Sequence, residues 1–137
     1  MVCSGSPNSE GGILIPDLIE TCYKTKIPKI AHEGNPFDVI HCSDDAAKKM
    51  ATHFGYKVNK WAGGWLYVKH YVGPHTDGNG KTLVHVARGA GDLGVVDKGR
   101  IDTTRMKKGE VWMFNDRQVH FWMSVTPCTL LVANVRK

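Results

Sequence analysis

Three residues of types that bind metal ions stand at informative positions in the chain. His75 and Asp77 are separated by one residue in the stretch GPHTDG, and His120 begins the later stretch HFWMSV. Side chains two residues apart in an extended segment point to the same face, so His75 and Asp77 are expected to point the same way. Two imidazoles and one carboxylate can hold a metal ion on one side and leave its other side open. The spacing indicates a metal site, and the Gly73-Pro74 pair is interpreted as a rigid corner that fixes the approach of the first two ligands.

The types of these ligands favour Fe(II) over a structural zinc ion. Imidazoles combined with one hard carboxylate suit Fe(II). Structural zinc sites use four closed ligands, often thiolates. The four cysteines of the chain include no CxxC pair and are expected to be reduced thiols: Cys3, Cys22, Cys42 and Cys128.

Short strands must position these ligands. From Tyr56 onward, runs rich in Val, Trp, Tyr, Thr and Phe are broken at close intervals by turn residues, including AGG, DGNG, DKG and KKG, which predicts antiparallel strands. Before Tyr56, apolar spacing predicts two helices, one at about 16–25 and one from Ser43 as N-cap to Gly55 as its left-handed stop. The expected fold class is mainly β with N-terminal helices (α+β), a small β-barrel or jelly roll. The eight strands are predicted at 56–60, 65–72, 82–88, 92–96, 100–106, 110–114, 120–125 and 129–135.

Length and composition fit one domain. A chain of 137 residues with 42% hydrophobic content can bury one core. We expect a flexible tail at 1–12 and a single domain at 13–137, with helical support at 13–55 and the barrel at 56–137. The sequence has no apolar run long enough to span a bilayer and no signal-peptide pattern, so a cytoplasmic location without a membrane partner is expected. The net charge of +5 permits an anionic partner without indicating one.

The order of these features resembles the 2-oxoglutarate/Fe(II)-dependent oxygenases of the double-stranded β-helix fold. A strand ends at Gly-Pro, HTD follows, the strand TLVHV comes next, and MKKGEVWMFNDRQVH then leads to the distal histidine and a last apolar strand. The resemblance covers about residues 56–137, and the segment before Tyr56 matches only loosely, as supporting helices.

The resemblance implies a set of cofactors and a reaction. Fe(II) at His75, Asp77 and His120 would chelate 2-oxoglutarate through its 1-carboxylate and keto oxygen and leave one position for O₂. The activity would be hydroxylation of a substrate C–H bond with release of succinate and CO₂. Retention of Asp77 argues against the halogenating relatives, in which this carboxylate is replaced.

The far carboxylate of 2-oxoglutarate needs a partner of its own. Many members of the superfamily have an arginine for this purpose at the start of the last strand, where this chain has Thr129. Arg136 is the first candidate, with Tyr67 as its partner, and Lys69 and Arg88 are further candidates. Strand alternation places Thr129 and Arg136 on opposite faces of the last strand unless a bulge intervenes.

The substrate and two alternative functions stay open. The lack of long insertions suggests an open mouth, which favours a protein or polymer side chain slightly over a nucleic acid or a metabolite. Arg117, close before His120, is a candidate contact for an anionic substrate. One alternative is a cupin-like metal-binding barrel acting as a non-oxidative enzyme or binding module, although cupins usually show HxH with a following Glu. The other is a degenerate barrel that only binds a partner.

Overall fold

The computed structural model describes residues 15–29, 38–78 and 80–136. The tail predicted at 1–12 lies outside the described residues. In this part of the chain the structure has ten strands and one helix: β2 (Asp17–Glu20), β3 (Val39–Ser43), α1 (Ala46–His53), β4 (Lys57–Val68), β5 (Tyr71–His75), β6 (Lys81–Arg88), β7 (Gly91–Asp97), β8 (Arg100–Met106), β9 (Val111–Asn115), β10 (Val119–Met123) and β11 (Cys128–Arg136).

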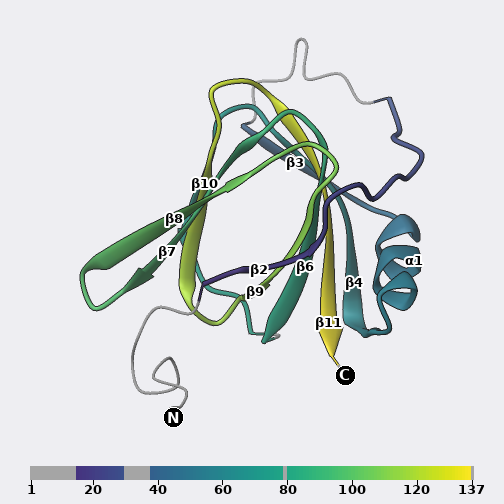
Figure 1. Cartoon of the computed structure of the whole chain (residues 1–137), viewed down its shortest axis with the longest axis horizontal. Coiled ribbons are helices and arrows are strands. Elements are labelled where there is room, and N and C mark those ends of the chain that lie inside the picture. The colour runs from purple at the N-terminus through teal and green to yellow at the C-terminus, as the bar shows by residue number, and fades with distance from the viewer. Residues whose placement is uncertain (1–14, 30–37, 79, 137) are drawn as a thin grey trace.

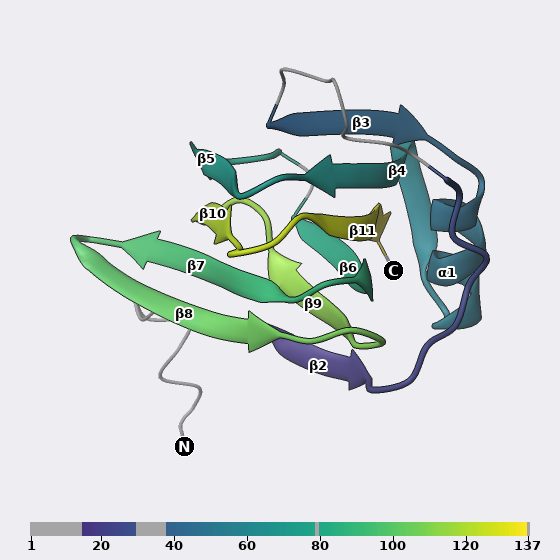
Figure 2. The same ribbon diagram turned by 90° about the horizontal axis from the view of Figure 1, so that it is seen from above.

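Two antiparallel sheets face each other (Figures 1 and 2). The smaller sheet has the strand order β5-β10-β7-β8, and the larger sheet has the order β2-β9-β6-β11-β4-β3. The chain passes repeatedly from one sheet to the other between β4 and β11, which makes the architecture a jelly roll, as the sequence predicted. α1 lies against the outer face of the larger sheet (Figure 2).

Hydrophobic side chains form two cores, one on each face of the larger sheet. The inner core, between the two sheets, includes Val84, Leu130 and Trp122. The outer core, between the larger sheet and α1, includes Trp65 and Leu131. Leu130 and Leu131 are neighbours in β11, and they belong to different cores because successive side chains of a strand point to opposite faces.

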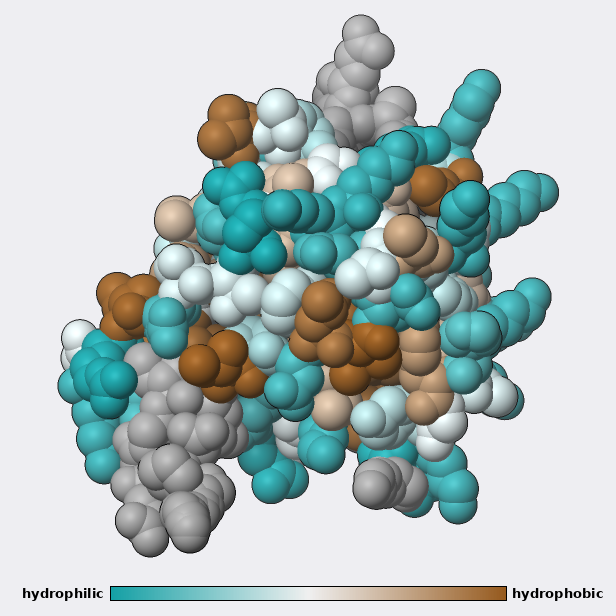
Figure 3. Space-filling view, viewed as in Figure 1, coloured by the Kyte–Doolittle hydropathy of each residue, from teal (hydrophilic) through white to brown (hydrophobic). Residues whose placement is uncertain are grey.

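The helix predicted before Gly55 is present. α1 begins at Ala46, whose N–H donates to Asp44 Oδ1 over 2.8 Å, and it ends before Gly55, which has a φ of 83°. The residue at the N-cap position is Asp45, not Ser43, because Ser43 pairs with Gly64 as the last residue of β3. The side of the molecule that carries α1 presents mainly hydrophilic side chains to solvent (Figure 3).

The helix predicted at 16–25 is wrong. Asp17–Glu20 is strand β2, and residues 21–29 form neither helix nor strand. Leu18 pairs with Trp112 of β9, so a hydrogen-bonded edge position in the larger sheet overrides the weak helical spacing. The region 13–55 is therefore not a helical support, since it contributes two strands and one helix in its described part.

The predicted strands agree with the structure from Lys81 onward, within two residues at each end. Before that, the prediction of two separate strands at 56–60 and 65–72 is wrong, because β4 runs without interruption through the predicted AGG turn. The Gly73-Pro74 pair is not a corner, since it lies inside β5. β5 is at the edge of its sheet, where a proline without an N–H is tolerated.

No helix in the described segments is long and apolar enough to cross a lipid bilayer.

Candidate metal centre

His75, Asp77 and His120 form a cluster at one end of the barrel. One possible ligand atom from each residue lies within 4.8 Å of the others. His120 Nε2 is 3.4 Å from Asp77 Oδ2, and His75 Nε2 is 3.7 Å from the same oxygen. The two imidazole rings are tilted by 60°, with their centroids 4.3 Å apart. Two nitrogens and one oxygen thus converge as the sequence predicted, and the described residues contain no other such cluster.

Both imidazoles are held in the tautomer that leaves Nε2 free to bind a metal ion. His75 Nδ1 lies 2.8 Å from the Gly73 carbonyl oxygen, and His120 Nδ1 lies 2.8 Å from the Gln118 carbonyl oxygen. A carbonyl oxygen only accepts, so each Nδ1 donates its hydrogen. In a neutral ring this leaves Nε2 with a free lone pair, directed toward the Asp77 carboxylate. Such backbone contacts orient metal-binding histidines and fix their tautomers.

Pairing between two strands brings the histidines together. β5 and β10 are antiparallel neighbours, and His75 is directly opposite His120 in their register. The register shifts between His120 and Trp122, a local irregularity of the kind that redirects side chains near functional sites. Asp77 follows β5, and its backbone N–H donates to the Asp116 carbonyl oxygen over 2.7 Å. The loop that carries the carboxylate is therefore tied to the loop that leads into His120.

Asp116 is a buried residue that the sequence did not single out. Its carboxylate accepts the Gly80 N–H over 2.6 Å and the Thr82 hydroxyl over 2.8 Å. Asn134 Nδ2 in turn donates to the Thr82 hydroxyl over 3.3 Å. Asp116 is fully buried. Nothing in the stretch NDRQ distinguishes it from an ordinary polar turn residue, because both partners of its carboxylate are distant in sequence.

Burial differs among the three members of the cluster. The His120 side chain is 5% exposed, whereas those of His75 and Asp77 are each 41% exposed. Burial lowers the pKa of His120, against a smaller raising effect of the hydrogen bond to the Gln118 carbonyl. A lowered pKa keeps His120 neutral and able to bind a metal ion near pH 7. The cluster thus has one buried ligand and two at an accessible mouth.

The cluster borders a cavity of about 200 Å³ between the two sheets. Thr82 lines it, but its hydroxyl already donates to Asp116. Trp122 also lines it, and its indole N–H is buried without an acceptor among the described residues. Apart from these and the cluster itself, the lining is hydrophobic: Leu66, Val72, Val84, Leu93, Phe114, Phe121, Leu130 and Val132.

The residues predicted to bind 2-oxoglutarate do not line this cavity. Tyr67 lies in the outer core, on the opposite face of the larger sheet, and Thr129 shares that face because it is two residues from Leu131. Arg136 is exposed at the end of β11, Arg88 is exposed at the end of β6, and Lys69 follows β4. The structure therefore joins the three predicted metal ligands and leaves the predicted 2-oxoglutarate contacts apart from them.

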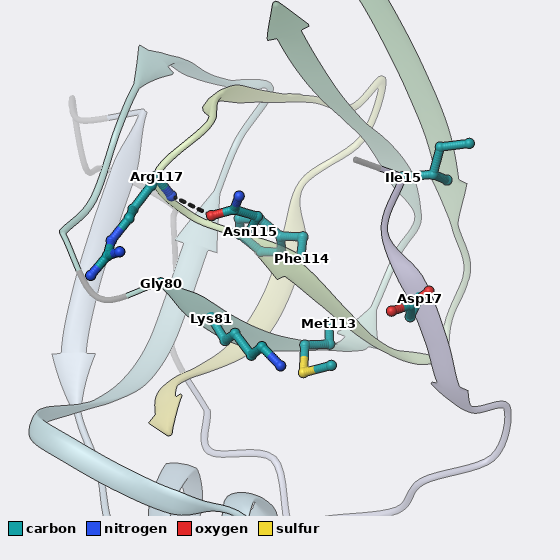
Figure 4. A pocket seen from close by; sticks show the side chains of 8 residues that line it. All are labelled: Ile15, Asp17, Gly80, Lys81, Met113, Phe114, Asn115 and Arg117. Carbon is teal, nitrogen blue, oxygen red and sulfur yellow. Dashed lines mark hydrogen bonds between the residues drawn. The ribbon is translucent and has the colours of Figure 1, made fainter. Parts of the chain in front are cut away.

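A second depression lies beside the cluster's end of the barrel, with a volume of about 510 Å³. Lys81, Asn115 and Arg117 line it on one side and Asp17 on the other (Figure 4). The Arg117 backbone N–H donates to Asn115 Oδ1 over 3.1 Å, which shapes the turn before His120. Arg117, predicted to contact an anionic substrate, is among the residues that line this depression and does not line the cavity between the sheets.

The fold and the cluster define a jelly-roll protein with a His-Asp-His site, and no protein-family model or curated protein matches its sequence. Similar solved structures include oxalate decarboxylase from Lactobacillus farciminis, with 14% identity and a TM-score of 0.45 over 51% of this chain and 22% of that chain. The ribosomal oxygenase YcfD from Escherichia coli has 15% identity and a TM-score of 0.46 over 53% of this chain and 22% of that chain. Hydroxypropylphosphonic acid epoxidase from S. wedmorenis has 14% identity and a TM-score of 0.43 over 51% of this chain and 41% of that chain. These matches span less than half of each of the three proteins and assign no activity or substrate to this chain.

Proposed function

We propose that this protein is a mononuclear non-haem iron oxygenase, with Fe(II) held by His75, Asp77 and His120. The observation that carries the proposal is the convergence of both Nε2 atoms on the Asp77 carboxylate, with both Nδ1 atoms bonded to backbone carbonyls. Two imidazoles and one carboxylate on one side of Fe(II) leave the opposite positions open, which is the donor set of non-haem iron oxygenases. Iron bound there would supply the activation of O₂ for insertion of oxygen into a substrate.

The chain's own residues provide geometry and a dry environment. The Gly73 and Gln118 carbonyls orient the imidazoles, and the backbone bond from Asp77 to Asp116 holds the carboxylate between them. The hydrophobic cavity beside His120 excludes water from one side of the site. The exposure of His75 and Asp77 gives the other side access to solvent and to a large substrate.

The finer form of this proposal is the 2-oxoglutarate-dependent hydroxylation that the sequence predicted. In that reaction O₂ is consumed together with 2-oxoglutarate and a substrate C–H bond, and the products are succinate, CO₂ and the hydroxylated substrate. The metal ligands fit it, but the cavity offers no cation for the far carboxylate. A protein or polymer side chain is the proposed substrate class, and the accessible mouth supports it.

Metal titration tests the proposal directly. The metal-free protein would be titrated with Fe(II) under nitrogen, beside His120→Ala and the control His70→Ala, which removes an exposed histidine outside the cluster. We expect the wild type to bind one Fe(II) per chain and His120→Ala to bind it more than about 100-fold more weakly. Loss of a hydrogen-bonding partner of a metal ligand already weakens metal binding by about 10- to 100-fold, and loss of the ligand itself should weaken it more. Equal affinities in all three proteins would contradict the assignment of the ligands.

Oxygen consumption then separates the oxygenase from the cupin-like alternative. The iron-loaded protein would be supplied with O₂ and with pools of peptides, nucleic acids or metabolites, with and without 2-oxoglutarate. Uptake of O₂ that depends on His120 supports an oxygenase, and accompanying succinate supports its 2-oxoglutarate-dependent form. A protein that loads iron and consumes no O₂ under any of these conditions would be a non-oxidative metal barrel.

A further inference from the structure

The cavity beside the metal cluster has no cation in its lining. Its walls are formed by inward-facing side chains of both sheets, such as Val84, Leu93 and Leu130. None of its lining residues is a lysine or an arginine, and Asp77 is its only carboxylate. The part of a metal-bound ligand that extends beyond the cluster would therefore contact hydrophobic side chains.

This lining is unsuited to the second carboxylate of 2-oxoglutarate. Moving an ionised carboxylate from water into a hydrophobic cavity without a cation is strongly unfavourable. The Thr82 hydroxyl is already bonded to Asp116. The indole N–H of Trp122 is a neutral donor that could pair with a carbonyl or a hydroxyl but would not neutralise a charge.

The predicted cationic contacts do not compensate, because none of them lines the cavity. Arg136 and Arg88 are exposed at strand ends, and Lys69 follows β4 outside the lining. Tyr67, predicted as the partner of Arg136, is on the opposite face of the larger sheet in the outer core. A carboxylate placed deep between the sheets would thus have no charged partner.

From this geometry we infer that the organic ligand of the metal is a hydrophobic molecule with a single anionic, metal-binding head group, and not a dicarboxylate. The head binds the open side of the metal, where Asp77 and the two histidines leave positions free. The body occupies the cavity of about 200 Å³. This inference rests on the proposed metal centre and replaces 2-oxoglutarate with a 2-oxo monocarboxylate or a similar chelating acid as the ligand class.

A matched pair of small molecules tests the inference. 2-Oxopentanoate has the chain length and the chelating head of 2-oxoglutarate, but it ends in a methyl group instead of the far carboxylate. Both would be titrated calorimetrically into the Mn(II)-loaded protein, which binds ligand without oxidising it. We expect 2-oxopentanoate to bind at least about tenfold more tightly, because only its far end can enter the cavity without losing hydration of a charge. Equal or tighter binding of 2-oxoglutarate would overturn the inference.

Substitutions at Leu130 test the cavity itself. Leu130→Ala enlarges it, so affinity should shift toward longer acids such as 2-oxooctanoate. Leu130→Arg places a cation inside and should shift preference toward 2-oxoglutarate, whereas the control Val125→Arg adds the same charge at an exposed site and should not. Near-ultraviolet circular dichroism would show whether each variant is folded. If Leu130→Arg does not fold, the comparison of the two acids on the wild-type protein still tests the inference.

Different results would overturn the proposed metal centre and the proposed ligand class. If the protein binds no metal at all, the metal centre and the ligand class are both overturned. If it binds the metal through His120 and prefers 2-oxoglutarate, only the ligand class is overturned. If it binds the metal and neither acid affects the site, the cavity does not receive a chelating ligand, and the ligand class is again overturned while the metal centre stands.

Discussion

At the residue scale, the three proposed metal ligands depend on groups outside the cluster. Each imidazole is oriented by a backbone carbonyl two residues before it in the chain, Gly73 for His75 and Gln118 for His120. The backbone N–H of Asp77 donates to the Asp116 carbonyl oxygen instead. Asp116 therefore connects the two segments that carry the ligands.

Replacement of Asp116 should weaken both the fold and the site. Asp116→Ala leaves the Gly80 N–H and the Thr82 hydroxyl without their acceptor, so the free energy of unfolding should fall by about 1.5–3 kcal/mol. Fe(II) affinity should fall by about 10- to 100-fold, as expected for groups that support metal ligands. Urea unfolding and metal titration measure the two effects.

The position of Thr82 provides a control for this prediction. Thr82→Ser keeps the hydroxyl that donates to Asp116 and should retain metal affinity, whereas Thr82→Val keeps the shape and removes the donor. If Asp116→Ala loses stability but binds Fe(II) as tightly as the wild type, the Asp116 carboxylate does not position the ligands.

At the element scale, β4 joins β3 to the rest of the larger sheet, because it pairs with both β3 and β11. Gly63 and Gly64 of β4 leave no room for a Cβ beside backbone atoms of these neighbours. A Cβ on Gly64 would overlap the Cys42 carbonyl oxygen, and a Cβ on Gly63 would overlap the Val132 carbonyl oxygen. These glycines permit close backbone packing inside a strand, although in the sequence they resemble a turn.

Gly64→Ala should therefore be strongly destabilising. Because the overlap is with backbone atoms, which cannot move aside cheaply, the free energy of unfolding should fall by at least about 1–3 kcal/mol. Gly78→Ala is the matched control, since a Cβ there meets nothing within 4 Å, and it should change stability by less than about 0.5 kcal/mol. Similar thermal midpoints for the two variants would show that β3 and β4 separate at low cost.

At the scale of the whole molecule, the larger sheet separates two environments with different contents. On its inner side lie the cavity and His120, a proposed metal ligand from β10 of the smaller sheet, and on its outer side lie α1 and the buried His85. His85 Nδ1 lies 3.2 Å from the Glu110 carbonyl oxygen, and its ring meets Tyr23 edge-on at 5.0 Å. Burial lowers the pKa of His85, partly offset by the hydrogen bond to Glu110.

This lowered pKa predicts a dependence of stability on pH. In the unfolded chain His85 has an ordinary pKa of about 6.5, so below that pH the unfolded state binds a proton that the folded state does not. The stability is thus fully present above about pH 6.5 and falls as the pH decreases toward the folded-state pKa. Urea unfolding of the metal-free protein between pH 5 and 7.5 should show this decrease, and His85→Gln should reduce its slope.

His120 contributes to the same slope in the metal-free protein, since burial lowers its pKa as well. The slope should therefore be reduced and not abolished in His85→Gln. Val125→Ala, at an exposed site, is the control and should retain the wild-type slope. An unchanged slope in His85→Gln would mean that His85 binds its proton equally well in the folded and unfolded states.

The sequence alone determined the strand-rich character of the barrel, the position of α1 and the three residues of the His-Asp-His cluster. These features depend on local patterns. Short runs of β-branched and aromatic residues between turn residues specify strands, Gly55 specifies the end of a helix, and the one-residue separation of His75 and Asp77 indicates a shared face. Each can be read without knowing what lies beside it in space.

Tertiary structure decided the features that depend on distant neighbours. Residues 17–20 are a strand because β9 offers them hydrogen-bonding partners, and Gly63-Gly64 lies inside β4 because β11 and β3 pair with that strand on its two sides. Tyr67 and Thr129 lie away from the cavity because of the face of the larger sheet on which their strand positions fall. Asp116 and the hydrophobic cavity exist only once segments distant in sequence are packed together, and no local pattern records which side chains will meet there.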